Sequence, residues 1–122
     1  MSAVPGDRDP QLLKGVLSLL LLHLLAEQES YGYEVVQRLH LIGLADLSAG
    51  TVYPALSRLE REGRLTARLV ASDEGPARKY YRPTRVGRDA LGEGTAQWNA
   101  LAVVVSNQLA RPLPTSPKGE TT

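Results

Sequence analysis

Hydroxyl, phenol and guanidinium side chains recur at helical spacing in SAGTVYPALSRLEREG, residues 48–63. A helix of this sequence would place Val52, Leu56 and Leu59 on one apolar stripe. Its outward stripe would hold Thr51, Tyr53, Pro54, Ser57, Arg58 and Arg61. Hydroxyl and guanidinium groups hydrogen-bond to phosphate oxygens and to the base edges of the major groove. The segment therefore predicts a helix that fits a DNA groove.

Both ends of this helix carry residues that are common at helix ends. Ser48 is a favoured N-cap and Gly63 suits a left-handed C-terminal stop, so we expect a helix from Ala49 to Glu62. In a groove, the side chains closest to base edges or flanking phosphates would be Thr51, Ser57, Arg58 and Arg61. Ser48 and Tyr53 would hold the DNA backbone.

The excess of positive charge lies directly after this helix. Residues 63–88 contain seven basic and two acidic residues, although the whole chain has a formal net charge of only +1. The basic residues are Arg64, Arg68, Arg78, Lys79, Arg82, Arg85 and Arg88. Residues 65–71 alternate as in a half-buried strand, residues 72–76 supply turn chemistry, and residues 77–82 predict a returning strand closed by Pro83. We expect a basic hairpin that contacts phosphates or the minor groove through Arg68, Arg78 and Lys79.

A helix followed by a basic hairpin is the order of a winged helix-turn-helix. Three segments carry a closer resemblance: SYGYEVVQRL (residues 30–39), LSAGTVYPALSRLEREGRL (47–65) and RKYYRPTRVGRDAL (78–91). They resemble the PadR family of winged-helix transcriptional regulators, with one departure at Pro83, where an apolar residue usually precedes the threonine that opens the last helix. The resemblance implies homodimers joined through the C-terminal helix, aromatic or multidrug-type effectors at the dimer interface, and repression as the commoner role.

Two further helices are expected before residue 48. Asp9-Pro10 is a favourable helix start for residues 10–26, and a second helix should cover residues 31–41. The leucine-rich run Leu12–Leu25 contains polar residues and is too short to cross about 30 Å of hydrocarbon. We therefore expect a helix buried on most sides, and neither a signal peptide nor a membrane span.

Composition and the histidines argue against catalysis. With 122 residues and 43% hydrophobic content, the chain can bury one modest core. It has no cysteine, which excludes a disulfide framework and a thiolate zinc site and fits a reducing cytoplasm. His23 and His40 have no partner at a spacing typical of acid–base or metal chemistry. We expect no enzyme, no metal site and no cofactor.

The last predicted helix, residues 85–109, carries a long apolar stripe and can be capped by Thr84. Heptad spacing joins Leu91, Trp98, Leu101, Ala102, Val105 and Leu109. Such a stripe requires a partner, and the simplest partner is the same helix of a second chain. Gly87, Gly92 and Gly94 each cost about 1 kcal/mol relative to alanine inside a helix, so we expect its first turns to bend or yield.

Trp98, the only tryptophan, is compatible with two roles. It can fill the core of a dimer interface. It can also form, with Leu101 and Ala102, a flat wall for an aromatic or hydrophobic effector, because planar ligands stack on indole. The sequence leaves both roles open.

Together these patterns predict a mainly α (α+β) fold, a winged helix-turn-helix with a two-stranded wing and a C-terminal dimerisation helix. The expected divisions are a flexible N-terminus (1–9), a DNA-binding domain (10–83), a dimerisation helix (84–110) and a disordered tail (111–122). The expected function is that of a cytoplasmic, ligand-responsive homodimeric repressor on a near-palindromic operator in double-stranded DNA.

Alternatives without DNA binding stay open beside this prediction. The helix at residues 49–62 could show only a solvated face, on which Arg58 and Arg61 pair with Glu60 and Glu62. A winged helix can also dock a partner protein instead of DNA, and a dimer cavity can carry a small molecule. The salt dependence of binding separates DNA binding from protein docking, since phosphate binding weakens steeply with ionic strength whereas apolar docking need not.

Overall fold

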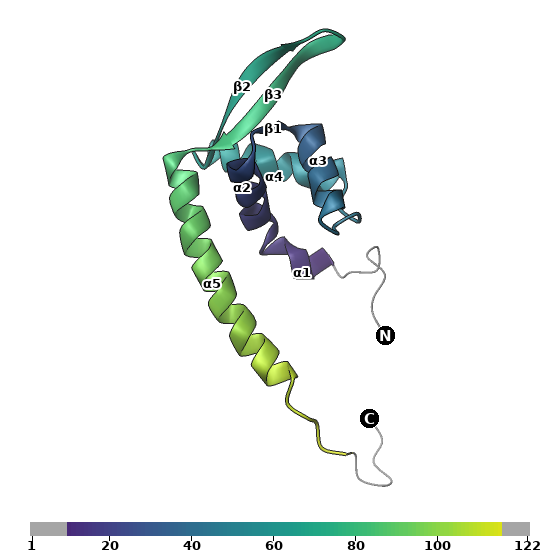
Figure 1. Ribbon diagram of the computed structural model, residues 1–122, viewed down its shortest axis with the longest axis vertical. Coiled ribbons are helices and arrows are strands. Elements are labelled where there is room, and N and C mark those ends of the chain that lie inside the picture. Colours follow the sequence, from purple (N-terminus) through teal and green to yellow (C-terminus); the bar gives the residue numbers. More distant parts are fainter. Residues whose placement is uncertain (1–9, 116–122) are drawn as a thin grey trace.

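The computed structural model describes residues 10–115, so the predicted flexible segment 1–9 and most of the predicted tail lie outside the described residues. Figure 1 shows a body of helices, a hairpin that projects from it, and a long helix that leads away. The elements are α1 (Pro10–Lys14), α2 (Leu17–Glu27), β1 (Ser30–Tyr31), α3 (Gly32–Leu41), α4 (Ala49–Arg61), β2 (Leu65–Ser72), β3 (Gly75–Pro83) and α5 (Arg85–Leu109). This order confirms the predicted succession of helices, hairpin and last helix.

The leucine-rich run forms one wall of the hydrophobic core. α2 buries Leu17, Leu21, Leu22, Leu24 and Leu25. Opposite them, α3, α4 and the start of β2 bury Val35, Val36, Leu39, Val52, Leu56, Leu59 and Leu65. Within residues 10–115, no helix combines the length and apolarity needed to cross a membrane.

The prediction of one helix over residues 10–26 is wrong, because α1 ends before α2 begins. Gly15 lies at the break, and its low helix propensity favours a turn there. The amide of Val16 donates to the carbonyl oxygen of Leu13 at 3.0 Å, which closes the turn. The predicted N-cap Asp9 lies outside the described residues.

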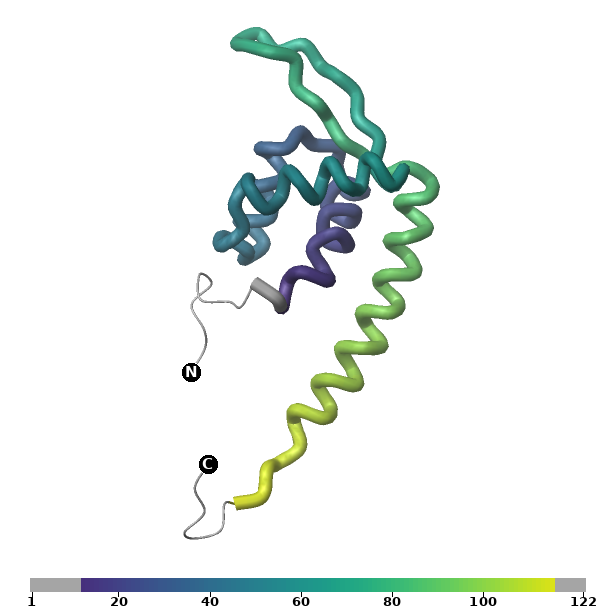
Figure 2. The backbone as a smooth tube through the Cα atoms, turned by 180° about the vertical axis from the view of Figure 1, so that it is seen from behind, coloured from purple at the N-terminus to yellow at the C-terminus, as the bar shows by residue number. Residues whose placement is uncertain are grey.

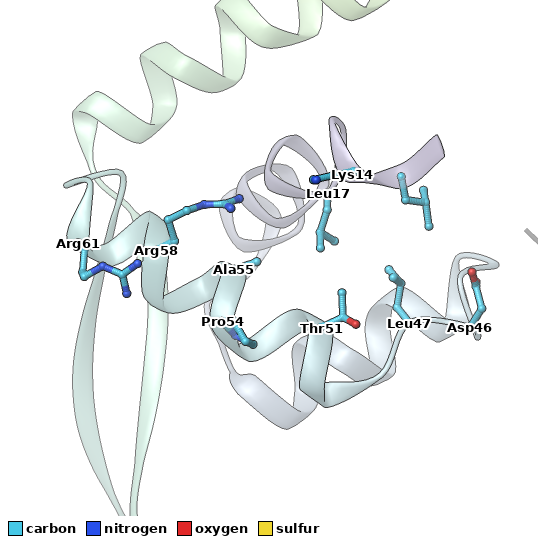
Figure 3. A pocket seen from close by; sticks show the side chains of 10 residues that line it. Lys14, Leu17, Asp46, Leu47, Thr51, Pro54, Ala55, Arg58 and Arg61 are labelled. Carbon is cyan, nitrogen blue, oxygen red and sulfur yellow. The ribbon is translucent and has the colours of Figure 1, made fainter. Parts of the chain in front are cut away.

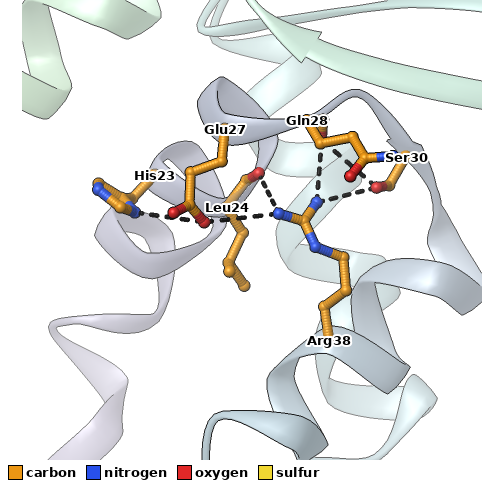
Figure 4. Close-up of polar contacts among 6 residues, drawn as sticks. All are labelled: His23, Leu24, Glu27, Gln28, Ser30 and Arg38. Carbon is orange, nitrogen blue, oxygen red and sulfur yellow. Dashed lines mark hydrogen bonds and ion pairs between the residues drawn. The ribbon is translucent and has the colours of Figure 1, made fainter.

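A half-buried arginine of α3 joins the helices of the core (Figure 4). Arg38 Nη2 donates to the carbonyl oxygen of Leu24 at 2.7 Å, and Nη1 donates to the carbonyl oxygen of Gln28 and to Ser30 Oγ, each at 2.9 Å. Glu27 lies 3.5 Å from Nη2. The Leu24 carbonyl oxygen also accepts a hydrogen bond from the Gln28 amide at 3.1 Å. The arginine fork therefore adds donors at the end of α2, where carbonyl groups lack partners inside the helix, and fixes this end to α3.

The sheet has three strands in the order β1-β3-β2, one more than the predicted two-stranded wing. β1 pairs only Ser30 with Tyr81 and Tyr31 with Tyr80. A two-residue strand has no periodicity, which explains why it was missed. Pro83 is the last residue of the central strand, paired with Leu65. It is tolerated there because β1 does not extend to this position.

The wing extends beyond the core, so the predicted half-buried alternation holds only at the start of β2. Leu65 is buried and Ala67 is partly buried, but Leu69 is 72% exposed. The strands lengthen to 65–72 and 75–83, and the turn shrinks to Asp73-Glu74. The distal wing is therefore held by strand pairing and not by the hydrophobic core.

The last helix begins with a capped turn that is pressed against the body. Thr84 Oγ1 accepts a hydrogen bond from the Gly87 amide at 3.0 Å and donates to the carbonyl oxygen of Gly63 at 2.6 Å. A Cβ on Gly87 would overlap the carbonyl oxygen of Arg64, and a Cβ on Gly94 would lie 2.8 Å from Leu19 Cδ1. α5 runs uninterrupted from residue 85 to residue 109, so its glycines do not break the helix, and a bend of its first turns stays a prediction. Gly87 and Gly94 permit close packing.

Candidate nucleic-acid interface

α4 shows the two faces that its sequence predicts. It begins after Ser48 and is followed by Gly63 at φ +76°, while Val52, Leu56 and Leu59 are at most 1% exposed. All outward residues are exposed: Thr51, Tyr53, Pro54, Ser57, Arg58 and Arg61. Ser48 is exposed too, but its side chain does not cap the helix, and its Oγ lies 3.5 Å from Thr51 Oγ1.

Helical geometry divides this exposed face into a crest and two flanks. At 100° per residue, Pro54, Ser57 and Arg61 lie along the crest. Thr51 and Arg58 lie on the flank toward α2, and Tyr53 lies on the opposite flank toward the wing. The crest is the part of α4 that a duplex would meet first.

A groove of about 570 Å³ lies on the α2 flank (Figure 3). Leu13, Leu17, Leu47 and Ala55 give it an apolar floor, and its cations are Lys14, Arg58 and Arg61. In Figure 3 the Arg58 guanidinium turns toward α2, where its Nη2 donates to Ser18 Oγ at 3.0 Å. Sequence reasoning missed Lys14, because nothing in the order of residues signals that α1 ends beside α4.

A smaller groove of about 230 Å³ lies on the wing flank and is lined mainly by tyrosines and cations. Tyr53 lies against Gly32, where a Cβ would come 2.9 Å from Tyr53 Cε1. Arg78 Cζ stacks 4.5 Å from the ring centroid of Tyr31, and Lys79 Nζ lies 5.5 Å from that of Tyr81. The cations nearest to α4 on the wing are thus placed by aromatic rings.

Two wing cations are bound by carboxylates of the body. Arg68 donates to both carboxylate oxygens of Glu29 at distances of 2.6–3.1 Å, and Lys79 Nζ donates to Glu60 Oε1 at 2.8 Å. These contacts join residues 39 and 19 positions apart, respectively, so sequence spacing does not reveal them. Glu62 lies 3.9 Å from Arg64. The alternative in which Glu60 and Glu62 neutralise Arg58 and Arg61 therefore has no support in the observed contacts.

The same contacts shift the ionisation of the groups that form them. The hydrogen bond from Arg68 lowers the pKa of the Glu29 carboxyl, and that bond also raises the pKa of the Arg68 guanidinium. The hydrogen bond to Glu60 raises the pKa of the Lys79 ammonium. Burial raises the pKa of the Tyr81 phenol. All four groups keep their usual charge near neutral pH, so the cations stay positive and locally paired.

A further groove of about 460 Å³ separates α2 from α5. Trp98 and Leu101 line it from α5, together with Leu19 and Leu22 from α2, whereas Ala102 is not part of its lining. Beyond this groove α5 leaves the body, as Figure 2 shows. Along the predicted stripe, Leu91 packs partly against the core, and the exposed members are Trp98 (45%), Leu101 (57%), Val105 (43%) and Leu109 (78%).

The histidines make structural contacts. His40 Nε2 lies 2.6 Å from the carbonyl oxygen of Leu47, and His23 Nδ1 lies 3.9 Å from Glu27 Oε1. In the part of the chain that the structure describes, no three His, Cys, Asp or Glu residues gather as a metal site would require.

Comparison with known proteins identifies the family. Residues 21–93, more than half of the chain, match the sequence profile of the Transcriptional regulator PadR-like family. The chain belongs to this family. The transcriptional regulator Rv3488 of Mycobacterium tuberculosis is 38% identical over 89 residues, which cover 73% of this chain and 81% of that protein.

Solved structures agree with the PadR-like assignment. The crystal structure of a PadR-like transcriptional regulator from Bacillus cereus superposes with a TM-score of 0.75 at 37% identity, covering 84% of this chain and 99% of that one. A PadR family regulator from Eggerthella lenta gives a TM-score of 0.76 at 36% identity, covering 84% and 88% of the two chains. The predicted family and winged-helix fold are confirmed, and the chain is a transcriptional regulator, not an enzyme.

Proposed function

We propose that this PadR-like regulator binds double-stranded DNA as a homodimer, with α4 in the major groove and the wing against phosphates. The observation that carries the proposal is the exposed stripe of α4, which lies beside a wing that carries the cations Arg68, Arg78, Lys79 and Arg82. A fully buried opposite face anchors this stripe to the core, so its side chains are presented on a rigid element.

Each exposed residue has a role that follows from its position. Ser57, Arg61 and the crest at Pro54 meet base edges, while Thr51 and Arg58 reach bases or phosphates from the α2 flank. Ser48 and Tyr53 hold the DNA backbone. Arg68, Arg78 and Lys79 contact phosphate through the wing, and Lys14 adds a cation on the opposite side of α4.

The exposed stripe of α5 supports the homodimer. Trp98, Leu101, Val105 and Leu109 are large apolar side chains, and all are more than 40% exposed in a single chain. A second copy of α5 would cover them and relate two copies of α4 by a two-fold axis. Two related helices match a near-palindromic operator, with half-sites about one helical turn apart.

Ligand response and repression extend this proposal. An aromatic or hydrophobic effector would bind between α2, α5 and the second chain, against Trp98, Leu101 and Ala102. By changing the spacing of the two α4 helices it would prevent both from occupying successive major grooves, which releases the operator. Such a repressor would act in the cytoplasm.

A gel-shift titration of the full chain against the duplex upstream of its own gene tests the function. We expect a retarded complex that resists competition by random duplex. A chain that binds no duplex at moderate salt, but captures a partner protein, would support the protein-docking alternative. Tight binding of a small molecule without any duplex affinity would support a carrier.

A further inference from the structure

The two carboxylates that bind the wing cations lie on opposite faces of the hairpin. Arg68 pairs with Tyr80 across the strands, so these two side chains share one face, and Lys79 next to Tyr80 points to the other. Glu29 therefore binds the wing from one side, and Glu60 binds it from the side of α4. Each strand of the wing is fixed to the body by one ion pair.

Both pairs are exposed enough to exchange partners. The side chains of Arg68 and Lys79 are 61% and 49% exposed, and those of Glu29 and Glu60 are 26% and 33% exposed. Exposed ion pairs are weak, because water and salt compete with them. A DNA phosphate offers the same kind of anionic oxygen pair as a carboxylate, and arginine and lysine bind both.

We propose that Glu60 and Glu29 act as intramolecular substitutes for DNA phosphates, holding Lys79 and Arg68 in the free protein and yielding them when duplex binds. This inference rests on the proposed function. The exchange has two consequences. The free wing is held at one angle to α4, and each ion pair must break before its cation can contact a phosphate. By holding Lys79, Glu60 lowers the affinity for DNA.

The carboxylates should matter most for random DNA. Binding to random duplex comes almost wholly from phosphate contacts, whereas operator binding also includes base contacts that require one register. Removing a carboxylate therefore strengthens random binding without adding any base contact. Glu60 and Glu29 are positioning residues that favour discrimination between operator and random DNA at the expense of affinity.

The test is fluorescence anisotropy of the full chain with a labelled random duplex of about 25 base pairs, long enough for two half-sites. Glu60→Gln removes the charge and keeps the shape of the side chain. We expect about 3- to 10-fold tighter binding at low salt, since Lys79 no longer has to leave a carboxylate before it contacts phosphate, and this gain should shrink as salt screens the Glu60–Lys79 pair of the wild-type chain. Glu29→Gln should act in the same direction. Asp89→Asn, which removes one negative charge from exposed α5, is the matched control and should change affinity less than about 2-fold.

Repeating the test in a chain without Lys79 makes it specific to the Glu60–Lys79 ion pair. In a Lys79→Gln chain, the additional Glu60→Gln substitution should give no larger gain than Asp89→Asn. Three results would overturn the inference. The gain in affinity from Glu60→Gln could persist without Lys79, it could be no larger than that of the Asp89→Asn control, or Glu60→Gln could lower the affinity. These results are distinct from failure of the proposed function, in which the wild-type chain itself binds no duplex.

Discussion

Gly87, in the first turn of α5, lies so close to the carbonyl oxygen of Arg64 that no side chain fits between them. The same carbonyl oxygen accepts a hydrogen bond from the Thr84 amide at 3.0 Å. Arg64 lies between the end of α4 at Arg61 and the start of β2 at Leu65, so this contact fixes the direction of α5 relative to α4 and the wing. In a dimer joined through α5, the spacing of the two α4 helices would depend on this junction.

Replacing Gly87 tests the junction. Gly87→Ala should lower the free energy of unfolding by about 1–3 kcal/mol, because the new methyl group must displace the backbone at Arg64. Gly92→Ala is the control, since a Cβ there meets nothing within 4 Å, and it should raise stability by about 0.5–1 kcal/mol. Urea unfolding of both variants at equal chain concentration gives the two values. Equal effects of the two substitutions would show that the contact does not constrain α5.

The arginine that closes α2 gives a second prediction. Arg38→Ala removes the side-chain donor from the carbonyl groups of Leu24 and Gln28, of which Leu24 keeps only the Gln28 amide, and should destabilise the fold by about 1–3 kcal/mol. Arg38→Lys keeps the charge but cannot donate to three acceptors as a planar fork, so it should restore only part of the stability. Arg88→Ala, at an exposed position of α5, should stay within about 0.5 kcal/mol of the wild-type chain. A fully stable Arg38→Ala chain would contradict the proposed closure.

The ion pair of Glu29 with Arg68 predicts a pH dependence. The pKa of Glu29 is lowered from its ordinary value of 4.5 in the folded chain, so the pair contributes stability above that value and loses it as pH falls through the lowered pKa. Wild type should therefore melt at a higher temperature than Glu29→Gln near pH 7, and the gap should close in acid. Thermal melts from about pH 7 to about pH 3 measure it. A gap that is constant over this range would exclude the ion pair as its cause.

Trp98 tests the dimer. Trp98→Ala should weaken dimerisation by about 3 kcal/mol if two α5 helices pack through this residue, and sedimentation should show a shift toward monomer. Val103→Ala is the control, because Val103 is 58% exposed and lies off the heptad stripe. If the Trp98→Ala dimer stays intact while planar aromatic compounds lose affinity, Trp98 forms the effector wall instead of the dimer core.

Elements with strong local signals could be predicted from the sequence. α4 and α5 follow from their apolar stripes and from Ser48, Gly63 and Thr84 at their ends, and both lie within one residue of the expected bounds. The break at Gly15 and the two-residue strand β1 carry no such signal.

For the site residues too, local spacing predicts some positions and not others. Helical spacing placed the outward residues of α4, from Thr51 to Arg61, on one exposed face. It could not show that Arg58 turns to Ser18, that Glu60 binds Lys79, or that Gly87 meets Arg64, because these partners come together only through the tertiary fold. Long-range contacts of this kind form only in the folded chain.

The salt dependence of DNA affinity tests the central claim most directly. If each subunit contacts about three or four phosphates, a dimer displaces about six to eight counterions, and the logarithm of the association constant should fall with the logarithm of salt concentration at a slope near −5 to −7. Anisotropy titrations of the wild-type chain with its upstream duplex, at several salt concentrations, give this slope. A slope shallower than about −2 would contradict the account, because α4 and the wing would then not be binding DNA through phosphates.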